Sequence, residues 1–161
     1  MGDFVTLSID IGSTFGWALG KNGVITHSDE VALAAKDAHP GHRFLKFREF
    51  LFNFRYVNEV LYEDVPRFES AGAAKVYGGL LAELQVFCLL NKIRMSSMKA
   101  SKVKMRFNGK GNANKFMMCE TAHKLGWKGG HVGTDIAHNE CDALALLWTV
   151  YSIRGLTPRF A

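Results

Sequence analysis

The sequence has few prolines, few cysteines and no long apolar run. Only three prolines occur among 161 residues and 48% of the residues are hydrophobic, which excludes a collagen-like or disordered chain and favours a folded globular protein. The longest uncharged apolar stretch, residues 143–153, is shorter than the roughly 20 residues that a membrane-spanning helix needs. We therefore expect a single domain over residues 1–161 without a membrane segment.

The N-terminus does not have the features of an export signal. Its first ten residues, MGDFVTLSID, include an acid at the third position and no basic residue before the apolar run. We therefore expect a cytoplasmic protein.

The three cysteines are odd in number, far apart and outside any CxxC pair, which is typical of reduced core thiols. A zinc site is an alternative, although the spacing of its candidate ligands fits no compact zinc motif. Those candidates are Cys119, His123, His131, His138 and Cys141.

Positive charge is concentrated in one segment. Residues 92–128 contain ten Lys or Arg and a single acid, Glu120, for a net charge of +9, whereas the rest of the chain carries −4. Such separation within a small protein is typical of a surface that neutralises phosphates. The alternative is a solvated lysine-rich face, but the acids and bases are segregated instead of mixed, so we favour nucleic-acid binding.

Hydrophobic periodicity predicts five strands and five helices. The strands span residues 4–11, 15–20, 24–33, 59–65 and 93–98, and the helices span 42–57, 77–91, 99–107, 114–125 and 139–154. Asn22-Gly23 predicts a tight hairpin between the second and third strands, and the later strand, helix, strand unit favours parallel pairing. This α/β layout, a mixed five-stranded sheet with three antiparallel and then two parallel strands flanked by helices, matches the ribonuclease H-like fold.

Three acids occupy otherwise apolar settings. Asp10 lies near the end of the first strand, Glu63 near the end of the fourth, and Asp142 early in the last helix. A buried carboxylate is costly unless it is paired or binds a metal, so we expect the three to converge on Mg²⁺ or Mn²⁺. Two such ions would activate water and stabilise the leaving oxygen of a phosphodiester. Any one of these acids could instead cap a helix or turn.

Four segments resemble RuvC-type Holliday junction resolvases, in the same order along the chain. LSIDIGSTFGWAL is similar to the opening strand and glycine turn of that family, and VLYEDVPRF is similar to its second acidic strand. SKVKMRFNGKGNANK resembles the basic segment, and NECDALALLW resembles the terminal acidic helix.

The resemblance implies a metal-dependent, structure-selective endodeoxyribonuclease that hydrolyses phosphodiesters in branched DNA such as four-way junctions. It puts two Mg²⁺ or Mn²⁺ ions on Asp10, Glu63 and Asp142, and it places Lys104 and Lys115 near the scissile phosphate. Because resolvases of this family act as dimers, it also implies a homodimer. The amphipathic helix 77–91 is a candidate interface, unless it simply packs on the sheet.

The fourth metal ligand departs from the family pattern. The family usually has an acid or a histidine three residues before the last Asp, and here that position is Asn139, with Glu140 beside it. On a regular helix Asn139 shares the face of Asp142, whereas Glu140 reaches the site only from a frayed helix start. We assign the ligand to Glu140, because a cation site gains more from a charge.

Further residues are expected to contact DNA. Lys115 begins a predicted helix whose free amides and dipole favour phosphate, although it could be an exposed lysine in a turn. Arg67 could touch the DNA backbone, and Phe68 could stack on a base at a branch point or equally well belong to the core. The basic residues Lys104, Arg106 and Lys110 complete the expected DNA-binding set.

Three alternative functions stay open. Residues 130–133 (GHVG), ahead of the last acidic helix, also fit a ribonuclease H-like nuclease that acts on RNA–DNA hybrids. Residues 10–14 (DIGST) resemble the phosphate loop of actin-like ATPases and sugar kinases, but those folds need two such domains. A junction-binding protein without catalysis would fit Asn139 in place of an acid.

Overall fold

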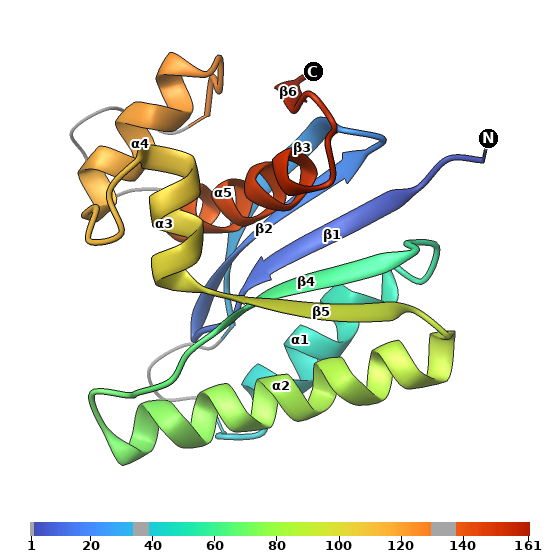
Figure 1. Ribbon diagram of the computed structural model, residues 1–161. Coiled ribbons are helices and arrows are strands. Elements are labelled where there is room, and N and C mark those ends of the chain that lie inside the picture. The colour runs from blue at the N-terminus through green and yellow to red at the C-terminus, as the bar shows by residue number, and fades with distance from the viewer. Residues whose placement is uncertain (1, 34–38, 130–137) are drawn as a thin grey trace.

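A mixed β-sheet organises the molecule. The computed structural model describes residues 2–33, 39–129 and 138–161. Within these residues the sheet has six strands in the order β5-β4-β1-β2-β3-β6 (Figure 1). They are β1 (Val5–Asp10), β2 (Thr14–Lys21), β3 (Val24–Ala32), β4 (Glu59–Asp64), β5 (Arg94–Lys99) and β6 (Arg159–Phe160).

The first three strands form the predicted antiparallel meander. Asn22 and Gly23 join β2 to β3 with φ angles of 50° and 90°, in the left-handed region. A two-residue turn of this kind matches the twist of paired strands, and Asn-Gly adopts it readily. Lys21 pairs with Val24 across the turn, so the predicted hairpin is confirmed.

Helices cover both faces of the sheet (Figure 1). They are α1 (His42–Phe52), α2 (Ala71–Asn91), α3 (Ala100–Asn108), α4 (Lys115–Lys124) and α5 (His138–Ile153). α1 and α2 pack on one face around Leu7 and Leu84, whereas α3, α4 and α5 pack on the other around Leu144 and Leu147. β4 pairs in parallel with β1, and β5 pairs in parallel with β4 across α2, as predicted.

The predicted α/β fold is confirmed with three corrections. The sheet has a sixth strand, β6, which pairs in parallel with β3 and is too short, at two residues, to show an alternating pattern. α2 begins at Ala71 instead of residue 77, because the hydroxyl of Ser70 accepts a hydrogen bond from the Ala73 amide and caps the helix. α1 ends at Phe52 instead of residue 57, and a turn follows it.

α5 lies directly against the sheet because glycines in β2 leave room for it. A Cβ at Gly16 would collide with the backbone of Asn139, and a Cβ at Gly20 would lie 2.5 Å from a side chain of α5. The Ser8 hydroxyl of β1 also donates a hydrogen bond to the Ala143 carbonyl at 2.7 Å. These contacts hold α5 along its length above β1 and β2.

α2 combines a buried face with an exposed apolar end. Among the described residues, α2 is the one helix with the length and the apolar composition to cross a membrane. The core helix of a globular protein can meet the same two criteria. The sequence did not predict this helix as a membrane-spanning candidate, because Glu83 interrupts its apolar residues. Leu80 and Leu84 are buried in the core, whereas Leu89 and Leu90 are 79% and 75% exposed.

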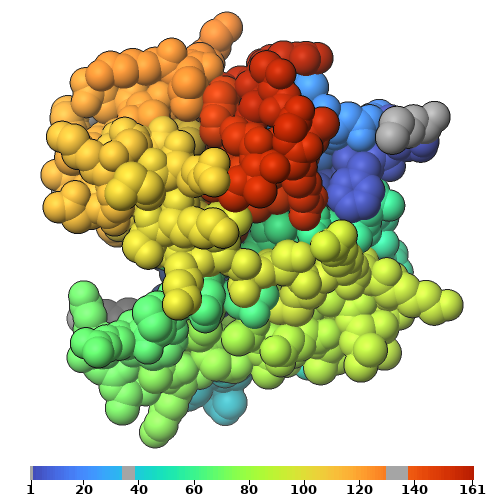
Figure 2. All heavy atoms as spheres, in the orientation of Figure 1, coloured from blue at the N-terminus to red at the C-terminus, as the bar shows by residue number. Residues whose placement is uncertain are grey.

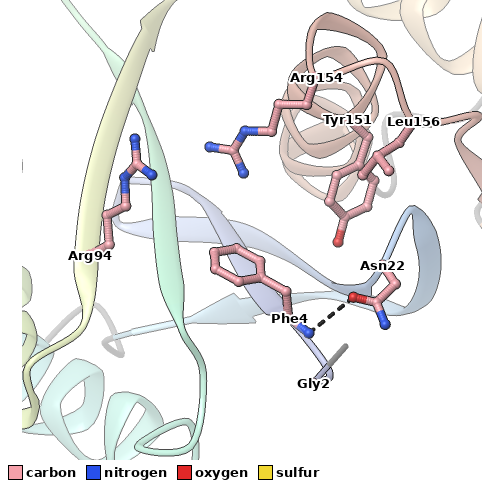
Figure 3. Close-up of a pocket in the computed structure, with 7 residues that line it drawn as sticks. All are labelled: Gly2, Phe4, Asn22, Arg94, Tyr151, Arg154 and Leu156. Atoms are coloured by element: carbon pink, nitrogen blue, oxygen red, sulfur yellow. Dashed lines mark hydrogen bonds between the residues drawn. The ribbon is translucent and has the colours of Figure 1, made fainter.

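The opposite end of the sheet, where β4 begins, holds a buried ion pair and a cavity. Glu59 is fully buried and accepts hydrogen bonds from both terminal nitrogens of Arg154 at 2.7 and 2.8 Å. A cavity of about 670 Å³ lies beside Arg154 (Figure 3). Its lining residues are Gly2, Phe4, Asn22, Arg94, Tyr151, Arg154 and Leu156. Because Phe4 precedes β1 and Asp10 ends it, this cavity lies at the other end of the sheet from the predicted acidic site.

Candidate active site

The three predicted acids lie where the central strands end. Asp10 is the last residue of β1, and Glu63 lies one residue before the end of β4. Because these strands are adjacent and parallel, both side chains belong to the same edge of the sheet. Asp142 belongs to the beginning of α5, which starts at that edge against Gly16, the residue paired with Asp10 (Figure 1).

Burial and mutual repulsion raise the pKa values of these acids. The pKa of Asp10 lies well above its usual range because the carboxyl is buried and because Asp142 and Glu63 are nearby. Burial, and then the charge of Asp142, raises the pKa of Glu63 to about 7. Burial also raises the pKa of Asp142. The three carboxyls therefore share a poorly hydrated site in which three negative charges are unfavourable.

Two lysines partly offset this repulsion. Lys104 of α3 lowers the pKa values of Glu63 and Asp142, and Lys115 of α4 lowers those of Asp10 and Asp142. The structure thus brings together five of the six residues that the sequence predicted for the reaction centre, and the sixth is Glu140. Their roles in metal binding and catalysis stay predictions.

Lys115 is the first residue of α4, as its sequence position predicts. The Asn114 side chain accepts a hydrogen bond from the Met117 amide at 2.9 Å and caps the helix. Amides in the first turn of a helix have no partner within the helix, so they and the helix dipole favour an anion. The exposed Lys115 therefore stands at an anion-attracting helix start beside the acids.

A fourth acid, Glu30 of β3, joins the site and was not predicted. Its Oε1 atom accepts hydrogen bonds from the backbone nitrogens of Asn139 at 2.8 Å and Glu140 at 3.2 Å, so it caps the start of α5. Asp10 pairs with Gly16, which pairs with Glu30, so the two acids lie in one row across three strands. Glu30 also raises the pKa of Asp10. The regular register of the hairpin would pair Gly16 with Asp29, but the pairing shifts between Leu19 and Gly20, so the hairpin alone does not point to Glu30.

The structure places the side chain of Glu140 outside this group. The Ser28 hydroxyl donates a hydrogen bond to Glu140 Oε1 at 2.6 Å. Burial raises the pKa of Glu140, and the side chains of Ser28 and Trp127 partly offset this rise. Within the described residues, the acids that raise the pKa of Asp10 are Asp142, Glu63 and Glu30. The position of Glu140 does not support its assignment as the fourth metal ligand, because the start of α5 is capped instead of frayed.

The donor set fits a hard divalent cation. Carboxylate oxygens are the ligands that Mg²⁺ and Mn²⁺ prefer, and a cation would relieve the repulsion among these acids. In residues 2–33, 39–129 and 138–161, no three His, Cys, Asp or Glu side chains are already grouped around a single ion position. The alternative zinc group is not assembled in these residues either, and its candidate His131 lies outside them.

The remaining predicted DNA-binding residues are exposed. Arg106 belongs to α3 and Lys110 follows it, whereas Arg67 and Phe68 lie in the connection from β4 to α2. Phe68 is 37% exposed and its ring contacts Tyr77 at a centroid distance of 5.0 Å, so it is a surface residue. Figure 2 shows a hollow in the surface between α3 (yellow) and the start of α2 (green).

These features define the class of fold as the ribonuclease H-like fold predicted above, and solved structures show the same architecture. RuvC of Thermus thermophilus is 19% identical with a TM-score of 0.73, covering 94% of this chain and 97% of that chain. RuvC of T. thermophilus in complex with a Holliday junction substrate is 19% identical with a TM-score of 0.76, covering 97% and 98%. The yeast mitochondrial Holliday junction resolvase Ydc2 is 12% identical with a TM-score of 0.68, covering 92% and 79%.

Protein-family models and curated protein sequences give no match to the chain. The solved structures alone establish a RuvC-like fold over nearly the whole chain. Residues 130–133, which suggested an RNA–DNA hybrid nuclease, lie outside the described residues.

The raised pKa values predict that the metal-free protein loses stability as pH rises. Folding raises the pKa of Glu63 from 4.5 to about 7, so its stabilising contribution is present below pH 4.5 and is lost as pH rises through 7. The change is up to about 3 kcal/mol in the free energy of unfolding. Urea denaturation with a chelator at several pH values measures it. Glu63→Gln should flatten the dependence, and an unchanged slope would contradict the shift.

The positions of Glu30 and Glu140 predict different effects on cation binding. Glu30→Gln should weaken Mn²⁺ binding several-fold, because it removes a negative charge that acts on Asp10. Glu140→Gln should leave binding nearly unchanged, because its carboxyl contacts Ser28. Titration calorimetry with Mn²⁺ compares the two variants. Weaker binding by Glu140→Gln than by Glu30→Gln would restore Glu140 as the fourth ligand.

Proposed function

We propose that the protein is a metal-dependent, structure-selective endodeoxyribonuclease that cuts branched DNA, above all four-way junctions, by hydrolysis of a phosphodiester. The observation that carries this proposal is the meeting of Asp10, Glu63 and Asp142 with two lysines at the edge of a RuvC-like sheet. Buried acids beside phosphate-attracting groups suit a cation and a phosphodiester together.

In this proposal the carboxylates of Asp10, Glu63 and Asp142 would hold Mg²⁺ or Mn²⁺ ions. When bound, these ions supply an activated water and a Lewis acid at the scissile phosphate. The raised pKa values mean that part of the acid set carries protons near neutral pH without a cation. Metal binding would therefore release protons from these residues.

Lys115 and Lys104 would act on the phosphate itself. Both lysines already act electrostatically on Asp142, so a phosphate bound beside the acids would lie within their influence. Lys115 also stands at the start of α4, where free amides favour an anion. Its ammonium would donate hydrogen bonds to oxygens whose negative charge grows in the transition state.

Selectivity for branched DNA would come from the surface around the hollow. The α3 side carries the exposed cations Arg106 and Lys110, which would track the phosphate backbone. The connection from β4 to α2 carries Arg67 and the half-exposed ring of Phe68, which would stack on a base left unpaired at a branch point. The two sides would thus contact different arms of a junction.

We further propose a homodimer formed through α2. Cutting a four-way junction symmetrically requires two active sites, and an isologous contact supplies them. The end of α2 exposes Val86, Leu89 and Leu90, which are 53%, 79% and 75% exposed. Burial of these side chains against a second copy would remove an apolar patch from water.

The carboxylates predict the first test of this function. Asp10→Asn, Glu63→Gln and Asp142→Asn should each lower cleavage of a four-way junction by more than about 100-fold, because the loss of even an outer-shell partner of a metal costs 10- to 100-fold. Junction binding should persist or tighten, because a charge that repels phosphate is removed. Cleavage and gel-shift assays with Mg²⁺ measure both quantities.

Asp64→Asn is the matched control, because Asp64 follows Glu63 in β4 and the alternation of the strand points it to the opposite face. It should cut at nearly the rate of the unmodified protein. A panel of junction, RNA–DNA hybrid and linear duplex substrates identifies the preferred substrate. Hybrid cleavage in preference to the junction would replace the proposed function, and binding without any cleavage would identify a binding protein.

Lys115 predicts a separation of catalysis from binding. Lys115→Ala should lower the single-turnover rate with enzyme in excess, because its charge acts at the acids. Lys110→Ala is the control: it should weaken DNA binding modestly and reduce the salt dependence of binding by about one ion. The single-turnover rate at which bound DNA is cleaved should stay unchanged. Equal single-turnover rates for the two variants would return Lys115 to the group that only tracks phosphates.

A further inference from the structure

Two cysteines meet where α4 packs against α5. Cys119 of α4 packs against the core cluster that contains Cys141 of α5, and Cys141 lies close enough to lower the pKa of Cys119. Cys119 is partly exposed, whereas Cys141 is 1% exposed. The third cysteine, Cys88, is buried on the other face of the sheet. One accessible thiol therefore lies beside one buried thiol, with a third as an internal reference.

A histidine lies beside the accessible thiol. The Nδ1 atom of His138 is 3.8 Å from the Sγ atom of Cys119. The contact with Cys141 and the neighbouring His138 lower the pKa of Cys119 to about 6, whereas burial raises the pKa of Cys88 to about 11. A thiolate is the form that attacks peroxides and disulfides. Cys119 is thus the most reactive of the three thiols.

We propose that Cys119 and Cys141 form an oxidation site, at which a hydroperoxide converts the two thiols into an intramolecular disulfide that joins α4 to α5. The Cys119 sulfur attacks the peroxide, the O–O bond breaks, and the departing oxygen takes a proton and leaves as water or an alcohol. Cys119 then carries a sulfenic acid. The Cys141 sulfur attacks it, the S–O bond breaks, and water leaves with the Cys141 proton. Two thiols are oxidised by two electrons, and one peroxide is reduced.

The disulfide would lie within one helical turn of the proposed reaction centre. Lys115 precedes Cys119 by four residues on α4, so the two share a face, and Asp142 directly follows Cys141 on α5. A disulfide holds its sulfurs about 2.05 Å apart, much closer than thiols in contact. Its formation would therefore shift the helix segments that carry Lys115 and Asp142. On the proposed function, we expect the oxidised protein to cut junctions more slowly.

Thiol counting and peptide mapping test the site without reference to cleavage. Titration of the purified protein with hydrogen peroxide should reduce the reactive thiols of the denatured chain from three to one, and a thiol reductant should restore them. Mass spectrometry of the unreduced digest should show Cys119 joined to Cys141. Cys88→Ala is the matched control and should form the same disulfide, whereas Cys119→Ser should form none.

Cys141→Ala provides the second variant. Without its partner thiol, Cys119 should stop at a sulfenic acid that a dimedone probe captures. The inference is overturned if Cys119 passes directly to sulfinic acid in the unmodified protein, or if the disulfides that form involve Cys88 or join two chains. Cleavage assays on reduced and oxidised protein separate the two proposals. No cleavage by the reduced protein overturns the nuclease function alone, whereas equal cleavage by both forms overturns the coupling between the disulfide and the site.

Discussion

The close approach of α5 to the sheet at Gly16 is the constraint on which the candidate site depends. The backbone of Asn139 occupies the space that a Cβ at Gly16 would fill, so any side chain there would push the start of α5 away. That shift would separate Asp142 from Asp10, the residue that pairs with Gly16. It would also break the hydrogen bonds that the first amides of α5 donate to Glu30. The absence of a side chain at Gly16 thus allows Asp10, Asp142 and Glu30 to lie at one site.

Two glutamates of β4 differ in how the protein compensates their charge. Glu59 at the start of the strand is fully buried, and Arg154 compensates its charge with two short hydrogen bonds. Glu63, four residues later, lies beside Asp142, and its pKa stays raised despite Lys104. Removing the partner of a compensated buried acid is strongly destabilising, whereas an under-compensated buried acid with a raised pKa is a candidate for a functional site. The two ends of the same strand therefore differ in how their buried charge is compensated.

Much of the fold and the acid set could be predicted, because both depend on patterns within short segments. Asp10 and Glu63 interrupt apolar strands, and Asn22-Gly23 marks the hairpin between β2 and β3. The role of Glu30 could not be predicted in this way, because it arises from contact with a helix more than 100 residues later. The contact of Glu140 with Ser28 could not be predicted for the same reason, since Ser28 comes from a distant strand. The start of α2 was missed because small residues follow its cap and carry no apolar periodicity.

The acids and the lysines of the site differ in how firmly the fold holds them. Asp10 and Glu63 belong to hydrogen-bonded central strands, and Asp142 belongs to a helix tied to Ser8 and the β2 glycines. Lys104 and Lys115 belong instead to α3 and α4, which pack mainly on α5 and on each other. Groups that would hold a cation need a fixed geometry, which a sheet and a helix packed against it provide. In the proposed nuclease, the sheet and α5 would therefore position the acids, whereas α3 and α4 would position the lysines. Cys119 and Cys141 lie between α4 and α5, so the proposed disulfide would join the helix that carries Lys115 to the helix that carries Asp142.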